Sequence, residues 1–242
     1  MSGKRTLRVA VLLSGSGRTL ENLIDRASSG ELDMEIPVVI SSRSKVRGVE
    51  VGREAGIETH VVTRREAPTP AELSGRVVEI LEPHDIDLML LAGYLLQLEI
   101  LPQWRGKILN IHPSLLPLFG GKGMYGHRVH EAVLDSGMKV SGCTVHIVNE
   151  EYDAGPIVAQ RCVPVEPGDT PETLGRRVFD AECELYPGSP TVLRRRARPP
   201  RRRSGFDFAV LTPSNSLIKM QKYCRGLAAV AACDWLLRHS MS

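Results

Sequence analysis

The sequence predicts an α/β fold, a Rossmann-like and mostly parallel sheet with helices on both faces. Short β-rich apolar runs alternate with amphipathic helical patterns along most of the chain, as in repeated βαβ units. The run at 86–92 is almost wholly apolar, which is typical of a strand buried on both faces. The first run, at 7–13, leads through glycines directly into a helical pattern. A single α/β domain accounts for these three observations.

Each predicted element is delimited by turn residues or by a change of periodicity. Strands are predicted where short apolar runs occur, at 7–13, 36–40, 59–62, 86–92, 107–111, 140–148 and 156–163. We expect the last of these strands to run antiparallel. Helices are predicted where apolar residues recur every three to four positions, at 20–27, 46–55, 71–81, 127–134 and 170–185. Gly56 and Pro83 mark the ends of two of these helices.

The character of the chain changes near Tyr186, which divides it into a domain at 1–187 and a tail at 188–242. Pro187 and Pro190 break the last helical pattern, and residues 194–203 are mostly arginine and proline without apolar periodicity. We interpret this run as a basic segment without ordered structure. A helical pattern returns at 217–237. The tail is therefore predicted to be a linker followed by a short helix.

Composition excludes several classes of protein. The net charge of +3 reflects nearly balanced acids and bases, whereas a dedicated nucleic-acid binder carries a strong basic excess. None of the five cysteines forms a C-x-x-C pair, so zinc or redox chemistry has no support, and reduced thiols in the cytoplasm are expected. No apolar stretch is long enough to span a membrane. We therefore expect a cytoplasmic protein, a monomer or a homodimer, with small-molecule partners.

The first candidate site is the loop after the first strand, because ligands bind beyond the carboxyl ends of parallel strands. Its glycines permit close backbone approach, and free N–H groups at a helix start can hold a phosphate. Leu20 stands where a dinucleotide-binding loop would have its third glycine. An ordinary strand-to-helix turn remains the alternative. The candidate phosphate-binding residues are Gly15, Ser16, Gly17, Arg18 and Thr19.

Polar side chains at the end of the 107–111 strand form the second candidate. Asn110 and His112 are two residues apart, which places both side chains on one face of an extended chain. An amide donor beside a histidine suits a reaction in which a carbonyl oxygen gains negative charge. Asp153, in an acidic loop that ends at a Gly-Pro turn, could pair with His112 and raise its pKa. A polar strand end and a solvated acidic turn are the alternatives.

Two further histidines, His127 and His130, lie three apart on a predicted helix. No third ligand at a suitable spacing supports a metal site there. We expect both histidines to be exposed or to cap the helix, and we expect no metal.

In order along 7–186, these segments resemble the phosphoribosylglycinamide formyltransferase family. The specific parts are Val-Leu-Leu-Ser-Gly-Ser-Gly at 11–17, Leu-Ala-Gly-Tyr at 91–94, Asn-Ile-His-Pro-Ser-Leu-Leu-Pro at 110–117, and Thr-Val-His-Ile-Val at 144–148 followed by Asp-Ala-Gly-Pro. The resemblance implies the formyltransferase fold for the domain at 1–187. It also implies transfer of a formyl group from 10-formyltetrahydrofolate to the amine of glycinamide ribonucleotide, a step of de novo purine synthesis, without a metal.

The same resemblance assigns roles to individual residues. Asn110, His112 and Asp153 match the family's catalytic trio, in which Asp153 keeps His112 protonated beside a tetrahedral oxyanion. Residues 15–19 match the phosphate site, Glu182 matches the acid that contacts the substrate amine, and Pro113 and His146 match supporting positions. The residues that match the folate pocket are Tyr94, Leu95, Leu96, Gln97 and Leu98.

The chain departs from the family pattern in four places, one of which is a helix from Ala71 that is shorter than usual. Arg18-Thr19 stands where Ser-Asn is common, the segment 119–126 with Lys122 is longer and richer in glycine, and the sequence after Tyr186 is unlike the family's last helix. A shifted reading frame would produce the last change, and resequencing the coding region tests that hypothesis. Methionyl-tRNA formyltransferase, formyltetrahydrofolate hydrolase and a non-catalytic nucleotide-binding module remain as alternatives.

Overall fold

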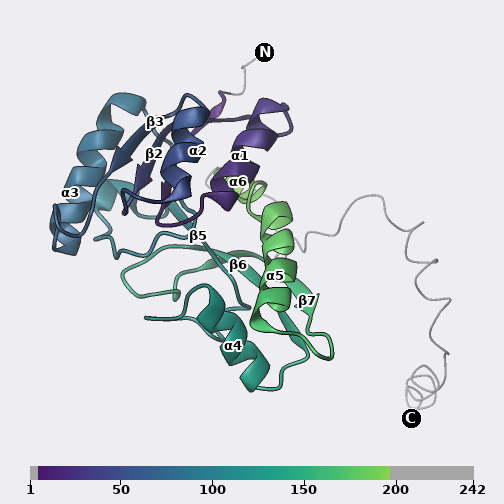
Figure 1. Cartoon of the computed structure of the whole chain (residues 1–242). Helices are drawn as coiled ribbons and strands as arrows, with labels where there is room; N and C mark the ends of the chain where they lie inside the picture. The colour runs from purple at the N-terminus through teal and green to yellow at the C-terminus, as the bar shows by residue number, and fades with distance from the viewer. Residues whose placement is uncertain (1–4, 197–242) are drawn as a thin grey trace, which may run out of the picture. The chain divides into compact units, whose positions relative to one another are not determined.

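The fold is a seven-stranded sheet covered by helices, described here by a computed structural model for residues 5–196 (Figure 1). The strands are β1 (Leu7–Leu13), β2 (Met34–Ser41), β3 (Glu58–Val61), β4 (Leu88–Leu91), β5 (Ile108–His112), β6 (Val140–Ile147) and β7 (Ile157–Pro164). The helices are α1 (Arg18–Ser28), α2 (Arg47–Glu54), α3 (Pro70–Leu81), α4 (His127–Asp135), α5 (Pro171–Leu185) and α6 (Ser189–Arg196), with short 3₁₀ turns at Glu82–His84 and Pro102–Trp104. The predicted α/β fold is confirmed.

The strand order is β3-β2-β1-β4-β5-β6-β7, and β1 to β5 pair in parallel. The chain first builds outward from β1 to β3 and then returns to place β4 on the other side of β1. The strand order therefore reverses between β1 and β4, which is where sheets of this type bind ligands. The loops after β1 and β4 leave the sheet side by side at this point.

The position of the reversed strand was predicted wrongly. Strand β6 is antiparallel to both β5 and β7, so β7 runs in the same direction as β1 to β5. From the sequence, the strand at 156–163 was expected to be the antiparallel one. A short connection at 148–156 makes β6 and β7 a hairpin, and hairpin strands must be antiparallel. Helix α4 lies in the connection between β5 and β6. Strand β6, the first strand of the hairpin, runs opposite to β5.

Two apolar layers cover the two faces of the sheet. Successive β1 side chains alternate between them, with Val9 and Val11 in one cluster and Ala10 and Leu12 in the other. The first cluster includes buried residues of α1, α4 and α5, and the second includes buried residues of α3. Helices therefore lie on both faces, as predicted.

Helix α5 is fixed at both ends, and this fixes the wall of the site that it forms. At its start, the Thr170 hydroxyl accepts the Thr173 N–H in a capping box. Just beyond its end, the Tyr186 ring is fully buried, and its hydroxyl lies 3.1 Å from the Leu91 carbonyl and 3.0 Å from the Leu109 carbonyl. Leu91 ends β4, and Leu109 precedes Asn110 in β5. The tyrosine thereby links α5 to the strand ends that carry the site.

The chain does not become an unstructured linker at 188. After a turn at Tyr186 and Pro187 it forms α6, in which Val192 and Leu193 pack against the core and Ser189 is buried. This helix was not expected from the sequence, because Pro187 lies just before it and Pro190 is its second residue. Proline is, however, tolerated in the first turn of a helix. The rest of the arginine-rich run and the predicted helix at 217–237 lie outside the described residues.

Three observations on residues 5–196 concern membranes, metals and thiols. No helix in this part of the chain is long and apolar enough to cross a membrane. Its histidine, cysteine and acidic side chains form no group of three or more that could hold a metal ion. The described cysteines are free thiols, with Cys143 buried, Cys162 exposed and Cys183 half-buried.

Candidate active site

A cavity of about 910 Å³ opens at the carboxyl ends of the parallel strands. The loops after β1, β4 and β5 line it, together with the acidic loop after β6 and one face of α5. Every residue that the sequence analysis assigned to a site lies on its wall: Gly15, Ser16, Gly17, Arg18, Thr19, Tyr94, Leu95, Leu96, Gln97, Leu98, Asn110, His112, Pro113, His146, Asp153 and Glu182. The volume is at the upper end for small-molecule sites, so it has room for more than one small substrate.

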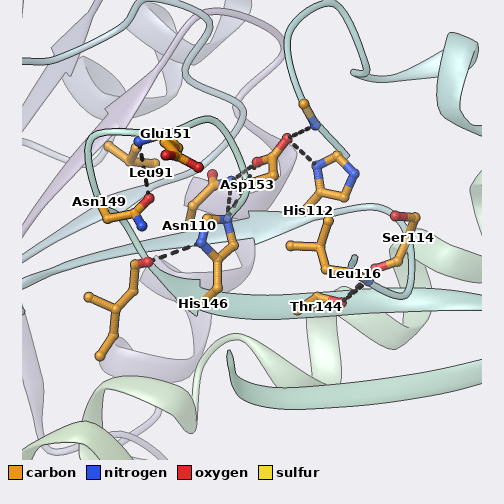
Figure 2. A network of polar contacts seen from close by, with 12 residues as sticks. Leu91, Asn110, His112, Ser114, Leu116, Thr144, His146, Asn149, Glu151 and Asp153 are labelled. Carbon is orange, nitrogen blue, oxygen red and sulfur yellow. Dashed lines mark hydrogen bonds and ion pairs between the residues drawn. The ribbon is translucent and has the colours of Figure 1, made fainter. Parts of the chain in front are cut away.

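Asp153 lies between Asn110 and His112 at the base of this cavity (Figure 2). Its Oδ2 is 3.5 Å from His112 Nδ1 and accepts the Gly121 N–H at 2.9 Å. Its backbone has a positive φ of 55°, and the chain can turn back at once because Gly155 lies against the Ile147 carbonyl, where any β-carbon would collide. The lack of space for a β-carbon therefore explains why the Asp-Ala-Gly motif has glycine at this position.

His146 controls the orientation of the Asn110 amide. The Nδ1 of His146 lies 3.1 Å from its own neighbour's carbonyl, Ile147 O, which can only accept a hydrogen bond. Nδ1 therefore carries a proton, while Nε2 lies 3.1 Å from Asn110 Nδ2 and 3.5 Å from Asp153 Oδ1. The second Asn110 N–H points to Asp153 Oδ1 at a long 3.5 Å. This weaker contact leaves one amide N–H that can turn toward a ligand.

The ionisation of His112 differs from the expectation. Burial lowers the pKa of His112, and this outweighs the opposing effects of the Asp153 carboxylate and of the Phe119 carbonyl, which lies 2.9 Å from Nε2. Asp153 raises this pKa, as expected, but burial has the larger effect, so the pKa of His112 is lowered overall. Burial also acts to raise the pKa of Asp153, but His146, His112 and the Gly121 N–H together lower it. The pair consists of a carboxylate beside an imidazole that is easily left neutral.

The loop after β1 has the geometry of an anion site. Gly17 caps α1 in a left-handed conformation, φ 77°, and no side chain satisfies the first N–H groups of the helix. The loop can sit close to α2 because Gly17 and Gly48 meet backbone to backbone. Arg18, the first residue of α1, places its guanidinium 3.6 Å from the centre of the Phe179 ring. Positive charge and free N–H groups thus face the same part of the cavity.

A buried serine joins this loop to the segment after β4. The Ser14 hydroxyl accepts the Leu95 N–H at 2.9 Å and lies 2.5 Å from the Ser42 hydroxyl at the end of β2. The segment 94–98 is thereby held along the cavity wall beside the β1 loop. The sequence analysis did not assign a role to Ser14. The signal in the sequence is a polar residue directly after a strand that is almost wholly apolar.

Glu182 is the acid on the α5 wall. It is only partly exposed, and burial raises its pKa to about 8, opposed by the Arg18 charge. In the native state, Glu182 therefore keeps its proton up to a higher pH than it does in the unfolded chain. Its contribution to the free energy of unfolding is present below the ordinary pKa of 4.5 and is lost as pH rises toward 8.

We expect Glu182→Gln to flatten the pH dependence of stability between pH 5 and pH 8. An amide resembles the neutral carboxyl and has no proton to lose, so it avoids a decline that can reach about 1.4 kcal/mol per pH unit. Urea unfolding followed by fluorescence at several pH values measures this. Asp180→Asn, at an exposed site on the same helix, is the matched control and should keep the wild-type slope. A wild-type slope in Glu182→Gln would contradict the prediction.

Three features of the cavity escaped the sequence analysis. The glycine-rich segment 119–126, which could not be placed, supplies the Phe119 carbonyl and the Gly121 N–H and brings Lys122 to the wall. Phe179 also lines the cavity. The expectation for His130 was wrong, since it is buried against Gly175 of α5, with Nδ1 unpartnered. His127 is exposed at the start of α4, between Glu131 and Glu172.

Comparisons with known proteins agree with this geometry. A family model described as formyl transferase matches residues 7–189. The chloroplastic phosphoribosylglycinamide formyltransferase of Arabidopsis thaliana is 40% identical over 185 residues, 75% of this chain and 63% of that protein. That of Haemophilus influenzae is 36% identical over 182 residues, 74% of this chain and 84% of that protein. The structure of glycinamide ribonucleotide transformylase 1 from Symbiobacterium toebii has a TM-score of 0.73 at 36% identity, covering 78% of this chain and 91% of that one.

The fold is a mostly parallel α/β sheet with a large cavity at its switch point. The chain belongs to the formyl transferase family. Its relatives in this family are named phosphoribosylglycinamide formyltransferases. The chain spans 63% of the length of the plant relative.

Proposed function

We propose that this chain transfers the formyl group of 10-formyltetrahydrofolate to the amine of glycinamide ribonucleotide. The observation that carries the proposal is the convergence of Asn110, His112 and Asp153 between a phosphate-binding type of loop and the 94–98 segment in one cavity. The names of the relatives support the choice of acceptor. A cytoplasmic location, a monomer or homodimer, and the absence of a metal remain predictions from the sequence.

The acceptor would bind with its phosphate at the start of α1. The uncapped N–H groups of the first turn and the Arg18 guanidinium provide donors and positive charge for a phosphate. Its amine would then lie toward Glu182, farther along the same wall. An ammonium group beside Glu182 favours the ionised carboxylate, so binding can offset the effect of burial on this acid.

The folate co-substrate would lie along residues 94–98. In this segment Tyr94 and Leu98 are buried, while Leu95 and Gln97 are exposed at the wall, so backbone groups and apolar side chains both border the cavity. The Ser14 hydrogen bond to Leu95 N–H holds the segment in place. The remaining backbone groups are suited to reading the polar edge of a flat ring.

The chemical step follows from the trio. The acceptor ammonium first gives one proton to the Glu182 carboxylate. The resulting neutral amine attacks the formyl carbon, a new C–N bond forms, and the carbonyl electrons move to oxygen. The Asn110 N–H that now makes only a long contact can donate to this oxyanion, and a protonated His112 supplies positive charge beside it. The bond from carbon to the folate nitrogen then breaks. The attacking nitrogen loses one proton and the leaving nitrogen gains one, so the step is balanced.

His112 can change its ionisation during this step. Its ring nitrogens face two oxygens, Asp153 Oδ2 and Phe119 O, so the doubly protonated ring would have an acceptor at each nitrogen. Burial, with a smaller contribution from His146, lowers its pKa in the free protein. A negative charge that develops nearby favours the protonated ring, and Asp153 favours it further. We propose that the pair relays the proton from the attacking to the leaving nitrogen, with a water in between.

The acceptor identifies the enzyme among formyltransferases. Incubation of the full chain with a 10-formyl-folate and either glycinamide ribonucleotide or charged initiator methionyl-tRNA, followed by mass spectrometry of the acceptor, separates the two alternatives. We expect formylation of glycinamide ribonucleotide only. Formylated methionyl-tRNA with unmodified glycinamide ribonucleotide would overturn the proposed acceptor.

We expect Arg18→Ala to raise the KM for glycinamide ribonucleotide about 10- to 100-fold, with a much smaller change in kcat. A charge-assisted contact to a phosphate contributes about 1.5–3 kcal/mol, and the phosphate does not take part in the reaction. Steady-state kinetics with each substrate varied in turn measures the effect. Arg26→Ala, on the same helix but paired with Glu31, is the control. An unchanged KM would remove Arg18 from the phosphate site.

A further inference from the structure

The contact between Arg18 and Phe179 joins two elements far apart in the sequence. The Arg18 guanidinium carbon is 3.6 Å from the centre of the Phe179 ring, so the cation lies on the ring face. Phe179 is half-buried, and it lines the cavity instead of joining either apolar cluster. It lies on the same face of α5 as Glu182, three residues further on.

The charge of Arg18 is left for a ligand. Within residues 5–196, no carboxylate forms an ion pair with it. Glu21, one turn further along α1, forms an ion pair with Arg47 instead. Glu182 is close enough for Arg18 to affect its ionisation, but burial raises the pKa of Glu182 to about 8, which keeps this acid neutral at neutral pH. An aromatic ring therefore holds the guanidinium in place without neutralising it.

We infer that Phe179 is a positioning residue: its ring holds the Arg18 guanidinium over the first turn of α1 so that both act together on the acceptor's phosphate. This inference rests on the proposed function and deepens it. A free arginine side chain has many rotamers, and fixing it on binding costs affinity. A ring that fixes it beforehand removes that cost.

A double-mutant cycle tests the inference. The variants are Phe179→Leu, which keeps apolar bulk but removes the ring face, Phe179→Tyr, which keeps the face, Arg18→Ala, and the combination of Phe179→Leu with Arg18→Ala. The readouts are the KM for glycinamide ribonucleotide, the KM for the folate, kcat, and the inhibition constant of inorganic phosphate. Thermal midpoints of all variants report on folding.

We expect Phe179→Leu to raise the KM for glycinamide ribonucleotide and the inhibition constant of phosphate about 3- to 30-fold, which is the range of a cation–π contact. The folate KM should stay within about twofold, and Phe179→Tyr should restore both values. In the Arg18→Ala background, Phe179→Leu should add little, because the group that it positions is gone. Unchanged phosphate parameters in Phe179→Leu, a full additional loss in the double variant, or no rescue by tyrosine would each overturn the inference.

The inference and the proposed function can fail separately. If the wild-type full chain turns over glycinamide ribonucleotide, the KM comparison decides. If it does not, the proposed function fails, and the binding of inorganic phosphate measured by calorimetry on the same variants decides instead. A loss of phosphate affinity in Phe179→Leu that disappears in the Arg18→Ala background supports the positioning role. Equal phosphate affinity in all variants, or no phosphate binding by the wild type, overturns it.

Discussion

His112→Ala is expected to lower kcat for formyl transfer by a hundredfold or more. The imidazole, beside Asp153, can bring a positive charge to the developing oxyanion and move a proton, and each of these effects contributes about 100-fold or more. Steady-state transfer assays at saturating substrates measure the loss. His60→Ala, at a histidine paired with Glu58 on β3 and outside the cavity, is the matched control. Near-normal turnover in His112→Ala would contradict the mechanism.

The stability of this variant must be measured beside its activity. His112 is almost fully buried, and its ring fills space between Asp153 and the Phe119 carbonyl. Because its folded-state pKa is lowered, wild-type His112 contributes stability that is fully present above about pH 6.5 and is lost as pH falls from there through the lower folded-state pKa. His112→Ala should lose part of this acid sensitivity. A folded variant with little activity separates a chemical role from a structural one.

Asp153→Asn is expected to cause a loss of similar size, again a hundredfold or more in kcat. The amide has nearly the same shape, and its oxygen can still accept the Gly121 N–H. It has no charge, so it no longer favours a protonated His112, and the transition state loses this support. The effect should therefore appear in kcat, with only small changes in the KM for either substrate.

The pH profile makes this prediction specific. The pKa of Asp153 is lowered, so the wild-type carboxylate is ionised throughout the neutral range. We expect Asp153→Asn to be slow at every pH between about 6 and 9, without a recovery at either end. Asp135→Asn, at an exposed acid on α4, is the control. Turnover of Asp153→Asn close to wild type at any of these pH values would remove the charge of Asp153 from the mechanism.

Much of the fold could be predicted because the sequence patterns depend on burial. Strands β1 and β4 are visible as nearly continuous apolar runs, and both were confirmed close to their predicted bounds. Strand direction has no such pattern, and the reversed strand was therefore assigned to β7 instead of β6. Helix α6 was missed because Pro187 just before it and Pro190 in its first turn look like breaks, although its apolar residues pack on the core.

The location of the site could be predicted for a topological reason, while its electrostatics could not. Asn110 lies near the end of β5 and the 15–19 loop follows β1; these parallel strands are separated only by β4, so both segments lie at the same edge of the sheet. The direction of the His112 pKa shift depends on the burial of its ring, which one sequence does not give. The Phe119 carbonyl and Gly121 N–H are backbone groups, and the residue names do not reveal where such groups point.

The most direct test of the account is absorbance-monitored formyl transfer from a 10-formyl-folate to glycinamide ribonucleotide by the purified full-length chain. The account predicts turnover that depends on both substrates, releases one deformylated folate for each formylated acceptor, and falls at least a hundredfold in His112→Ala. Folded protein that releases no folate in the presence of glycinamide ribonucleotide would contradict it.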